Sequence, residues 1–147
     1  AKLSENVWKE AEKMLEQIQK YPQKEEYQKL VEADRINLYE REAEKGDDRK
    51  FLEETDRVFK ENLRGDPAWK LYERKLVYLE SKQPDISGEF ERFLKKYPKV
   101  MDAYVEYSIY LCRNNKMTQA QRVYREGRKQ TGMTSKRAEE LRRKLGL

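Results

Sequence analysis

The chain has 147 residues, of which 41% are charged and 37% hydrophobic, and its formal net charge is +5. This length suits one domain with a buried core, and ten Tyr, four Phe and two Trp exclude a disordered composition. The single cysteine excludes an internal disulfide, and the absence of histidine removes a common general base and metal ligand. No apolar run is long enough to predict a membrane span.

Apolar residues at helical spacing predict eight helices along the chain. No alternating strand pattern of useful length competes with them. The connections are short, so consecutive helices are expected to be antiparallel neighbours. The predicted helices span residues 4–20, 24–45, 48–64, 66–81, 85–96, 99–113, 118–130 and 134–145.

Residues that favour helix ends mark the boundaries. Proline disfavours helix at the residue before it, which predicts breaks at Tyr21 and Tyr97. Glycine suits a left-handed C-cap, and Ser, Thr or Asp can accept a backbone hydrogen bond at an N-cap. Gly46 is the expected C-cap of the second helix, Gly65 is expected to close the third, and Thr131-Gly132 to stop the seventh. The expected N-caps are Ser4, Asp66 and Thr118.

Two patterns repeat together about every 33 residues. The segment 57–61 (RVFKE) returns as 122–126 (RVYRE), and Phe90 and Phe93 occupy the matching place between them. An apolar residue followed three positions later by tyrosine recurs upstream of each copy. A period of 20–50 residues predicts a solenoid, in which each unit buries its apolar face against its neighbours. The apolar-Tyr pairs are Ile36/Tyr39, Trp69/Tyr72 and Tyr104/Tyr107.

These paired helices resemble the half-a-TPR (HAT) repeat. That repeat has an aromatic-x-x-aromatic first helix, which Trp69 and Tyr72 match, and a second helix of the form Ala-Arg-x-Val-Phe-Glu-Arg-Ala, which Ala120, Val123 and Tyr124 match. The resemblance implies an all-α, right-handed solenoid of antiparallel helical hairpins, forming a single repeat domain over 1–147. Its implied units are 33–65, 66–97 and 98–130, with an N-terminal helix over 4–20 and a capping helix over 134–145. The implied repeat core is Ile36, Tyr39, Val58, Phe59, Trp69, Tyr72, Phe90, Phe93, Tyr104, Tyr107, Val123 and Tyr124.

HAT arrays act mainly as protein scaffolds and dimerisation modules in RNA-processing assemblies, so the resemblance implies an intracellular, nuclear scaffold that binds a peptide, a helix or a second copy. Two alternatives stay open: a module that binds RNA directly, and a TPR-like adaptor outside RNA metabolism. Neither catalysis nor a cofactor or metal is predicted. Cys112 has no histidine to act as its base, and the neighbouring carboxylate pairs point about 100° apart on a helix.

The net positive charge belongs to the C-terminal part of the chain. Residues 113–147 hold eleven Lys or Arg and three acids, a balance of +8, so the other 112 residues sum to −3. A basic helical face can bind the phosphates of RNA or an acidic peptide, and the alternative is a solvated outer face. The candidate basic face is Arg122, Arg125, Arg128, Lys129, Lys136, Arg137, Arg142 and Arg143.

Two further features have competing interpretations. Tyr104, Tyr107 and Tyr110 at helical spacing suit either a stacking platform for bases or core packing, and aromatics at this spacing favour the core. The first helix, with Val7 and Trp8, has no repeat counterpart downstream. It is either an N-terminal cap or the second half of a hairpin whose first half is missing. If the chain is a piece of a longer array, we expect a bare apolar edge there and concentration-dependent dimerisation through that end.

Overall fold

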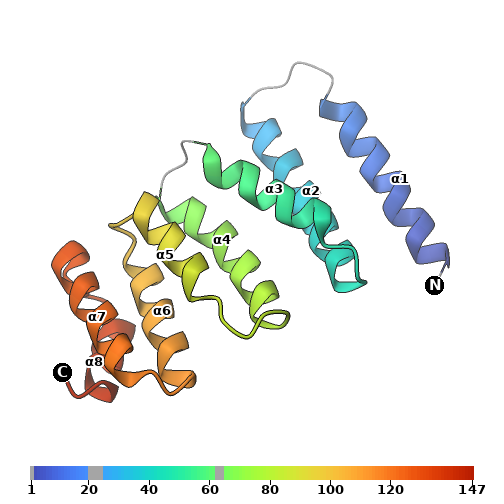
Figure 1. Ribbon diagram of the computed structural model, residues 1–147. Helices are drawn as coiled ribbons and strands as arrows, with labels where there is room; N and C mark the ends of the chain where they lie inside the picture. The colour runs from blue at the N-terminus through green and yellow to red at the C-terminus, as the bar shows by residue number, and fades with distance from the viewer. Residues whose placement is uncertain (1, 20–24, 62–64) are drawn as a thin grey trace. The chain divides into compact units, whose positions relative to one another are not determined.

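The described part of the chain is all-α, with eight helices and no strand (Figure 1). The computed structural model describes residues 2–19, 25–61 and 65–147, and side chains for 6–17, 32–61 and 65–147. The helices fall into two compact units, Ala1–Lys60 (unit 1) and Glu61–Leu147 (unit 2). Unit 1 holds α1 (Lys2–Gln19), α2 (Glu25–Glu44) and α3 (Arg49–Lys60). Unit 2 holds α4 (Gly65–Glu80), α5 (Ser87–Lys96), α6 (Met101–Arg113), α7 (Met117–Thr131) and α8 (Lys136–Lys144).

All eight predicted helices are confirmed, and most of their ends agree within two residues. The predicted break at Tyr21 lies outside the described residues, as does the segment 62–64. The division into three repeat units and the solenoid arrangement stay predictions.

Several predicted caps are wrong. Ser4, Asp66 and Thr118 lie inside their helices, because α1, α4 and α7 begin one or two residues earlier than predicted. Gly65 opens α4 instead of closing α3. A β-carbon at Gly65 would lie 2.6 Å from Cγ2 of Val100, so glycine is needed there for close packing.

The glycine signals at two helix ends are confirmed. Gly132 follows α7 with a φ of 82°, and its N–H donates to the carbonyl of Arg128. Gly46 follows α2 with a φ of 116°, which only glycine adopts readily. A third cap was not predicted: Ser135 precedes α8, and its Oγ accepts from the N–H of Ala138 at 3.1 Å.

A layer of aromatic rings joins α4, α5 and α6 in unit 2. The ring of Phe93 lies 5.1 Å from Trp69 and 5.2 Å from Tyr72, measured between centroids. Phe90 stacks on Tyr107 at 4.8 Å with nearly parallel rings. All five side chains are buried, so each ring adds contact area and favourable ring geometry to the core.

The helices α6 and α7 approach very closely. A β-carbon added at Gly127 would lie 2.8 Å from both Cβ and Cγ of Tyr104. Tyr124 extends the packing to α8, where its hydroxyl donates to the carbonyl of Ala138 at 3.2 Å. The C-terminal helix is therefore part of the packed unit, and its Leu141 is buried.

Among the described side chains, unit 1 combines an apolar core with ion pairs. The core side chains of α2 and α3 include Ile36, Phe51 and Val58. Around them, Glu54 accepts from Arg57 at 2.6 Å and pairs with Arg35 at 3.3 Å. Arg57 also pairs with Glu32, and Lys50 of α3 pairs with Glu12 of α1. Charged groups thus connect all three helices of the unit.

The predicted repeat core is buried at every position except one. Phe59, Phe90 and Tyr124, which occupy matching places in the repeat, are all buried as expected. Val123 is half-buried instead, because it faces a groove between helices and not the core.

Candidate partner-binding surfaces

An apolar groove runs between α1 and α2 in unit 1. Its volume is about 500 Å³, and we call it the unit 1 groove. The α1 wall is entirely apolar, whereas the α2 wall has one apolar residue and three polar or charged residues. The α1 wall consists of Val7, Trp8, Ala11, Met14 and Leu15, and the α2 wall of Asp34, Asn37, Leu38 and Arg41.

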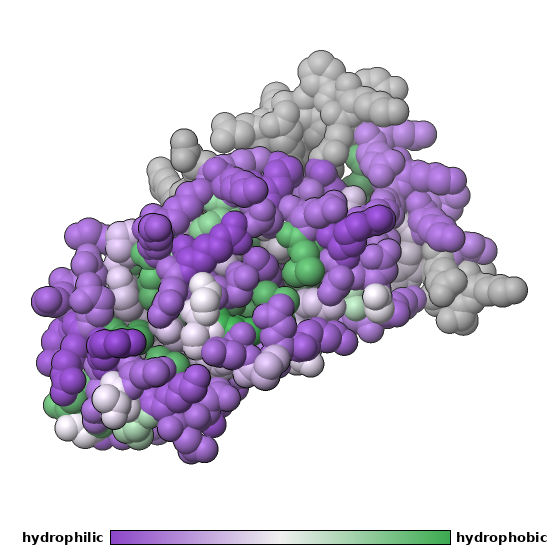
Figure 2. Space-filling view, in the orientation of Figure 1, coloured by the Kyte–Doolittle hydropathy of each residue, from purple (hydrophilic) through white to green (hydrophobic). Residues whose placement is uncertain are grey.

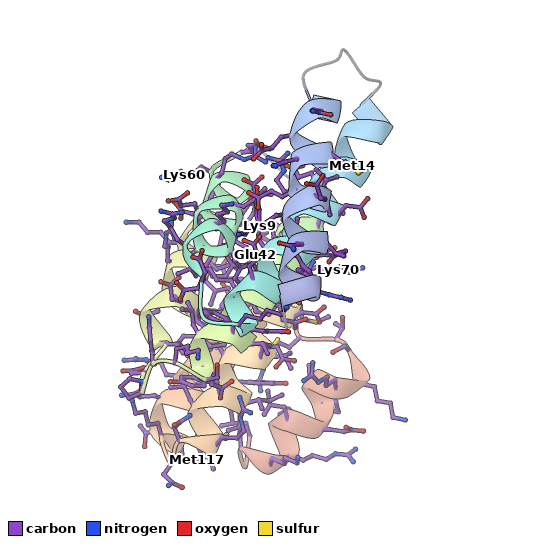
Figure 3. All side chains as sticks on the ribbon, turned by 90° about the vertical axis from the view of Figure 1, so that its right-hand side faces the viewer. Lys9, Met14, Glu42, Lys60, Lys70 and Met117 are labelled. Carbon is purple, nitrogen blue, oxygen red and sulfur yellow. The ribbon has the colours of Figure 1, made fainter. Side chains whose placement is uncertain are left out.

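The apolar face of α1 is only partly covered. Trp8 and Leu15 are half-buried beside α2, but Val7 is 60% exposed and Met14 61% exposed. Val7 and Met14 are seven residues apart, which places them on one stripe of the helix. α1 (Figure 3) therefore presents large apolar side chains that unit 1 itself does not bury.

Opposite charges lie at different places along the groove. The Arg41 guanidinium lies 5.1 Å from the Trp8 ring centroid, and the Lys45 ammonium lies 4.6 Å from it. Both distances are within the range of cation–π attraction. Asp34 lies seven residues before Arg41 on α2, is exposed, and has no ion-pair partner among the described residues. The α2 wall is therefore negative toward one end and positive toward the other.

A second groove lies among α5, α6 and α7, with a volume of about 540 Å³, and we call it the unit 2 groove. Hydrogen bonds from their hydroxyl groups fix the two tyrosines that line it. The hydroxyl of Tyr104 donates to the carbonyl of Pro98 at 2.7 Å, and that of Tyr107 donates to Glu91 Oε1 at 3.1 Å. Burial, followed by the bond to Glu91, raises the pKa of Tyr107 to about 12.

Charges of both signs surround the unit 2 groove. Its α5 wall includes Glu91 and Lys95, and its α7 wall includes Arg122 and Glu126. Leu94 and Val123 provide apolar surface between them. A groove of balanced charge does not concentrate a polyanion.

The eight residues of the candidate basic face do not form one free surface. Arg137 of α8 pairs with Glu106 of α6. Arg142 donates to Glu139 at 2.6 Å and to the carbonyl of Leu147 at 2.7 Å.

Arg128 lies over the Tyr124 ring at 5.2 Å. The other three basic residues of α7 are Arg122, Arg125 and Lys129, and we call them the α7 basic ridge. All three are exposed, and none has an ion-pair partner among the described residues. The remaining members of the candidate face, Lys136 and Arg143, are exposed on α8.

The three consecutive tyrosines of α6 belong to the core. Tyr104, Tyr107 and Tyr110 are each less than 5% exposed, and the Tyr110 hydroxyl accepts from the N–H of Ile86 at 3.0 Å. The interpretation as core packing is confirmed, and these rings offer no platform for bases. Hydrophilic side chains cover most of the face shown in Figure 2, where apolar groups form small separate areas.

Three further findings concern the thiol, metal ligands and the length of the apolar helices. Burial raises the pKa of the Cys112 thiol, which makes the nucleophilic thiolate scarcer. No three His, Cys, Asp or Glu side chains among the described residues gather where they could hold a metal ion. Within the same residues, no helix is both long and apolar enough to cross a membrane.

Comparison with known proteins adds no relative. No protein-family model matches the chain, no curated protein matches it, and no solved structure matches it.

Proposed function

We propose that this chain is an interaction scaffold of an RNA-processing assembly, built as a HAT-like solenoid, and that its unit 1 groove binds a helix. The observation that carries the proposal is the apolar stripe of Val7 and Met14, exposed beside that groove. Apolar surface that a protein leaves exposed marks an interaction site, and a groove between helices accepts the apolar face of an amphipathic helix.

The assignment to an RNA-processing assembly rests on the family resemblance alone. The aromatic pairs of α4 and α6 support a HAT-like hairpin, because Trp69, Tyr72, Tyr104 and Tyr107 are all buried. RNA-processing complexes, and with them a nuclear location, follow only from what HAT repeats do elsewhere. A TPR-like adaptor outside RNA metabolism would use the same hairpins, and the identity of the partner separates the two.

Affinity capture with matched variants tests the scaffold proposal. The variant V7E/M14E places two charges on the apolar stripe. The control V77E/M117E makes the same chemical changes at a valine 67% exposed and a methionine 46% exposed, both in unit 2. We expect V7E/M14E to lose RNA-processing proteins that the wild type and the control both retain. Equal capture by all three proteins would refute the proposal.

The α7 basic ridge supports a second candidate, direct binding of RNA. Reversing the charges of Arg122, Arg125 and Lys129 should flatten the log–log salt dependence of single-stranded RNA binding by about 0.7 for each lost contact, roughly 2 in all. The control K9E/K70E/K99E changes the net charge equally at exposed lysines elsewhere. If both triple variants weaken binding alike, the ridge is not an RNA site.

A further inference from the structure

We propose that the unit 2 groove and the α7 basic ridge form one docking surface for an amphipathic helix of a partner protein, in which a stripe of acidic residues adjoins the apolar stripe. This surface belongs to unit 2, so the inference goes beyond the proposed function, which concerns the unit 1 groove. Three observations carry it: the apolar floor of the groove, the ridge along its edge, and the spacing of the charges on the ridge.

The floor of the unit 2 groove is apolar and accessible. Leu94 of α5 and Val123 of α7 are half-buried, so each leaves part of its surface open to the groove. Tyr104 and Tyr107 also line the groove, and their hydroxyls donate within the domain. The volume of about 540 Å³ lies within the usual range for ligand pockets. An apolar side chain of a partner would displace water from this floor, which favours binding.

The α7 basic ridge forms one edge of the groove. Arg122 belongs to both, because it lines the groove and begins the ridge. Arg125 and Lys129 follow it at three and seven residues, on the same stripe of α7. The neighbouring stripe, with Val123 and Glu126, faces the groove. A partner that lies in the groove therefore has cations along one of its sides.

The charges around the groove favour an acidic partner. The groove lining itself is balanced, but Arg125 and Lys129 raise the balance of groove and ridge to +2. Lys95 on the α5 wall is exposed, and like the ridge it has no ion-pair partner among the described residues. Carboxylates of a bound helix would supply these missing partners.

The two carboxylates of the lining favour a polypeptide over RNA. Glu91 accepts from the Tyr107 hydroxyl, and Glu126 accepts from the side-chain amide of Gln130, each at 3.1 Å. Both keep their negative charge, which repels a phosphate chain laid along the floor but not an apolar side chain. RNA would also need rings on which bases can stack, and Tyr104 and Tyr107 are each only 4% exposed.

The spacing along the ridge indicates that the partner is helical. Arg122 and Lys129 lie seven residues apart, about 10 Å along α7. A helix lying along α7 has the same spacing, so acids at i, i+3 or i+4, and i+7 can reach all three cations while the adjoining apolar stripe faces the floor. An extended peptide covers the same length in about three residues and points alternate side chains away from the ridge.

Synthetic peptides of about 15 residues test the docking surface on the full chain. The first has leucines on one helical stripe and glutamates on the adjoining stripe. The second replaces these glutamates by lysines, and the third keeps the composition of the first in an order without stripes. By fluorescence anisotropy, the first should bind at least about tenfold more tightly than the others, and added salt should weaken it. Equal binding of the first peptide and either of the others would overturn the inference.

Charge reversal tests whether the ridge is the contact. R122E/R125E/K129E should bind the glutamate peptide at least about tenfold more weakly than the wild type does, and should gain affinity for the lysine peptide. Circular dichroism verifies that the variant is folded. An unchanged affinity for the glutamate peptide would overturn the docking surface.

A matched control separates the ridge from the net charge. K9E/K70E/K82E changes the net charge equally, at exposed lysines that do not line the groove. It should keep the wild-type preference among the three peptides. If it loses the glutamate peptide as the ridge variant does, net charge explains the binding and the docking surface is wrong.

Changes to the floor separate a helix from RNA. L94Q/V123T removes apolar surface and leaves every charge in place, so it should weaken the glutamate peptide about tenfold and leave the binding of a single-stranded oligouridylate unchanged. V123T alone, a smaller change, should act in the same direction if the double variant does not fold. If oligouridylate binds the wild type more tightly than the glutamate peptide does, and the ridge variant loses it, the ridge is an RNA site and the inference is wrong.

The unit 1 variant distinguishes this inference from the proposed function. V7E/M14E lies in the other unit and should bind the glutamate peptide as the wild type does. If that peptide does not bind the wild type while V7E/M14E still loses captured partners, the docking surface is wrong and the scaffold proposal stands. If the peptide binds at the ridge while V7E/M14E retains every captured partner, the docking surface stands and the scaffold proposal fails.

Discussion

Unit 2 joins α4, α5 and α6 through a layer of buried aromatic rings, whereas the described contacts of α1 in unit 1 include an ion pair to α3 and two cations over the Trp8 ring. In the described part of α1 the buried side chain is Glu12, which pairs with Lys50 of α3. Its large apolar side chains that the structure describes, Val7, Trp8, Met14 and Leu15, are half-buried or exposed. Among the described side chains, α1 thus adds no buried apolar group to the core of unit 1, and it leaves Val7 and Met14 exposed.

This difference has a physical consequence. Buried rings exclude water and depend little on salt, whereas ion pairs near the surface are screened as ionic strength rises. Unit 2 should therefore keep its stability over a wide range of salt, and unit 1 should respond to salt and to occupancy of its groove. Changes that remove one kind of contact should affect the two units differently.

The largest expected effect comes from the aromatic layer of unit 2. Phe90 stacks on Tyr107, and its ring centroid lies 5.5 Å from that of Tyr110. Phe90→Ala should reduce the free energy of unfolding by about 3–5 kcal/mol, the usual range for a buried aromatic truncation. Denaturant titration measures the loss, and Phe90→Leu should retain more of the stability. A wild-type unfolding curve for Phe90→Ala would contradict the role of the ring layer.

A smaller effect tests the close approach of α6 and α7. Gly127→Ala places a β-carbon 2.8 Å from Tyr104, so the helices must separate, at a cost of about 1–3 kcal/mol. Gly88 in α5 is the matched control, because a β-carbon there meets nothing within 4 Å. Gly88→Ala should be neutral or stabilise the helix by up to about 1 kcal/mol. Equal effects of the two alanines on the melting temperature would argue against a close crossing.

The helices and the aromatic core could be predicted because they depend on local spacing. Trp69 and Tyr72, or Phe90 and Phe93, fall on one face of any helix that contains them. The caps were harder to predict, since Asp66 and Thr118 have capping side chains but the backbone enters its helix before reaching them. A good capping residue does not determine where the chain begins to turn.

The binding surfaces depend on neighbours that are distant in sequence. The sequence shows that Arg137 and Arg142 are basic, but it does not show that Glu106 of α6 pairs with Arg137. Likewise, helical spacing places Val7 and Trp8 near one apolar face, and only packing against α2 decides that Trp8 is half-buried and Val7 exposed. Gly127, which stands where the HAT pattern has alanine, is explained only by the position of Tyr104.

A third prediction concerns the ion pairs of unit 1. Glu54 is buried and forms ion pairs with both Arg35 and Arg57. Glu54→Gln should lower the local stability of α2 and α3 by about 1–3 kcal/mol, between the values for exposed and fully buried pairs. Amide hydrogen exchange resolves the two units, and protection should fall in unit 1 alone. Glu139→Gln, at an exposed pair in α8, should leave protection unchanged.

The smallest expected effect is a difference in pH dependence between the units. In unit 1, burial raises the pKa of Glu42, and the neighbouring Glu12 raises it further. In unit 2, burial acts to raise the pKa of Glu89, but the hydrogen bond from Tyr72 at 2.5 Å and the charge of Lys75 outweigh it, so the pKa lies below 4.5. The folded state therefore disfavours the charged form of Glu42 and favours the charged form of Glu89.

Because the pKa of Glu42 is raised and that of Glu89 is lowered, replacing each with glutamine should have opposite effects on stability. A raised carboxyl pKa means that ionised Glu42 opposes folding above that pKa, so Glu42→Gln should stabilise unit 1 at neutral pH. That gain should shrink as the pH falls through the raised pKa and Glu42 itself becomes protonated. A lowered pKa means that Glu89 stabilises unit 2 above about pH 4.5, so Glu89→Gln should destabilise it at neutral pH.

The loss for Glu89→Gln should disappear as the pH falls from 4.5 through the lowered pKa of the wild-type carboxyl. Denaturant titrations of the wild type and both variants, from neutral pH down to about pH 3, measure both curves within the range where carboxylates titrate. The comparison between the units holds if the two substitutions differ in sign at neutral pH and converge on the wild type in acid. It fails if both glutamines change the free energy of unfolding in the same direction, because the surroundings of Glu42 and Glu89 would then act alike.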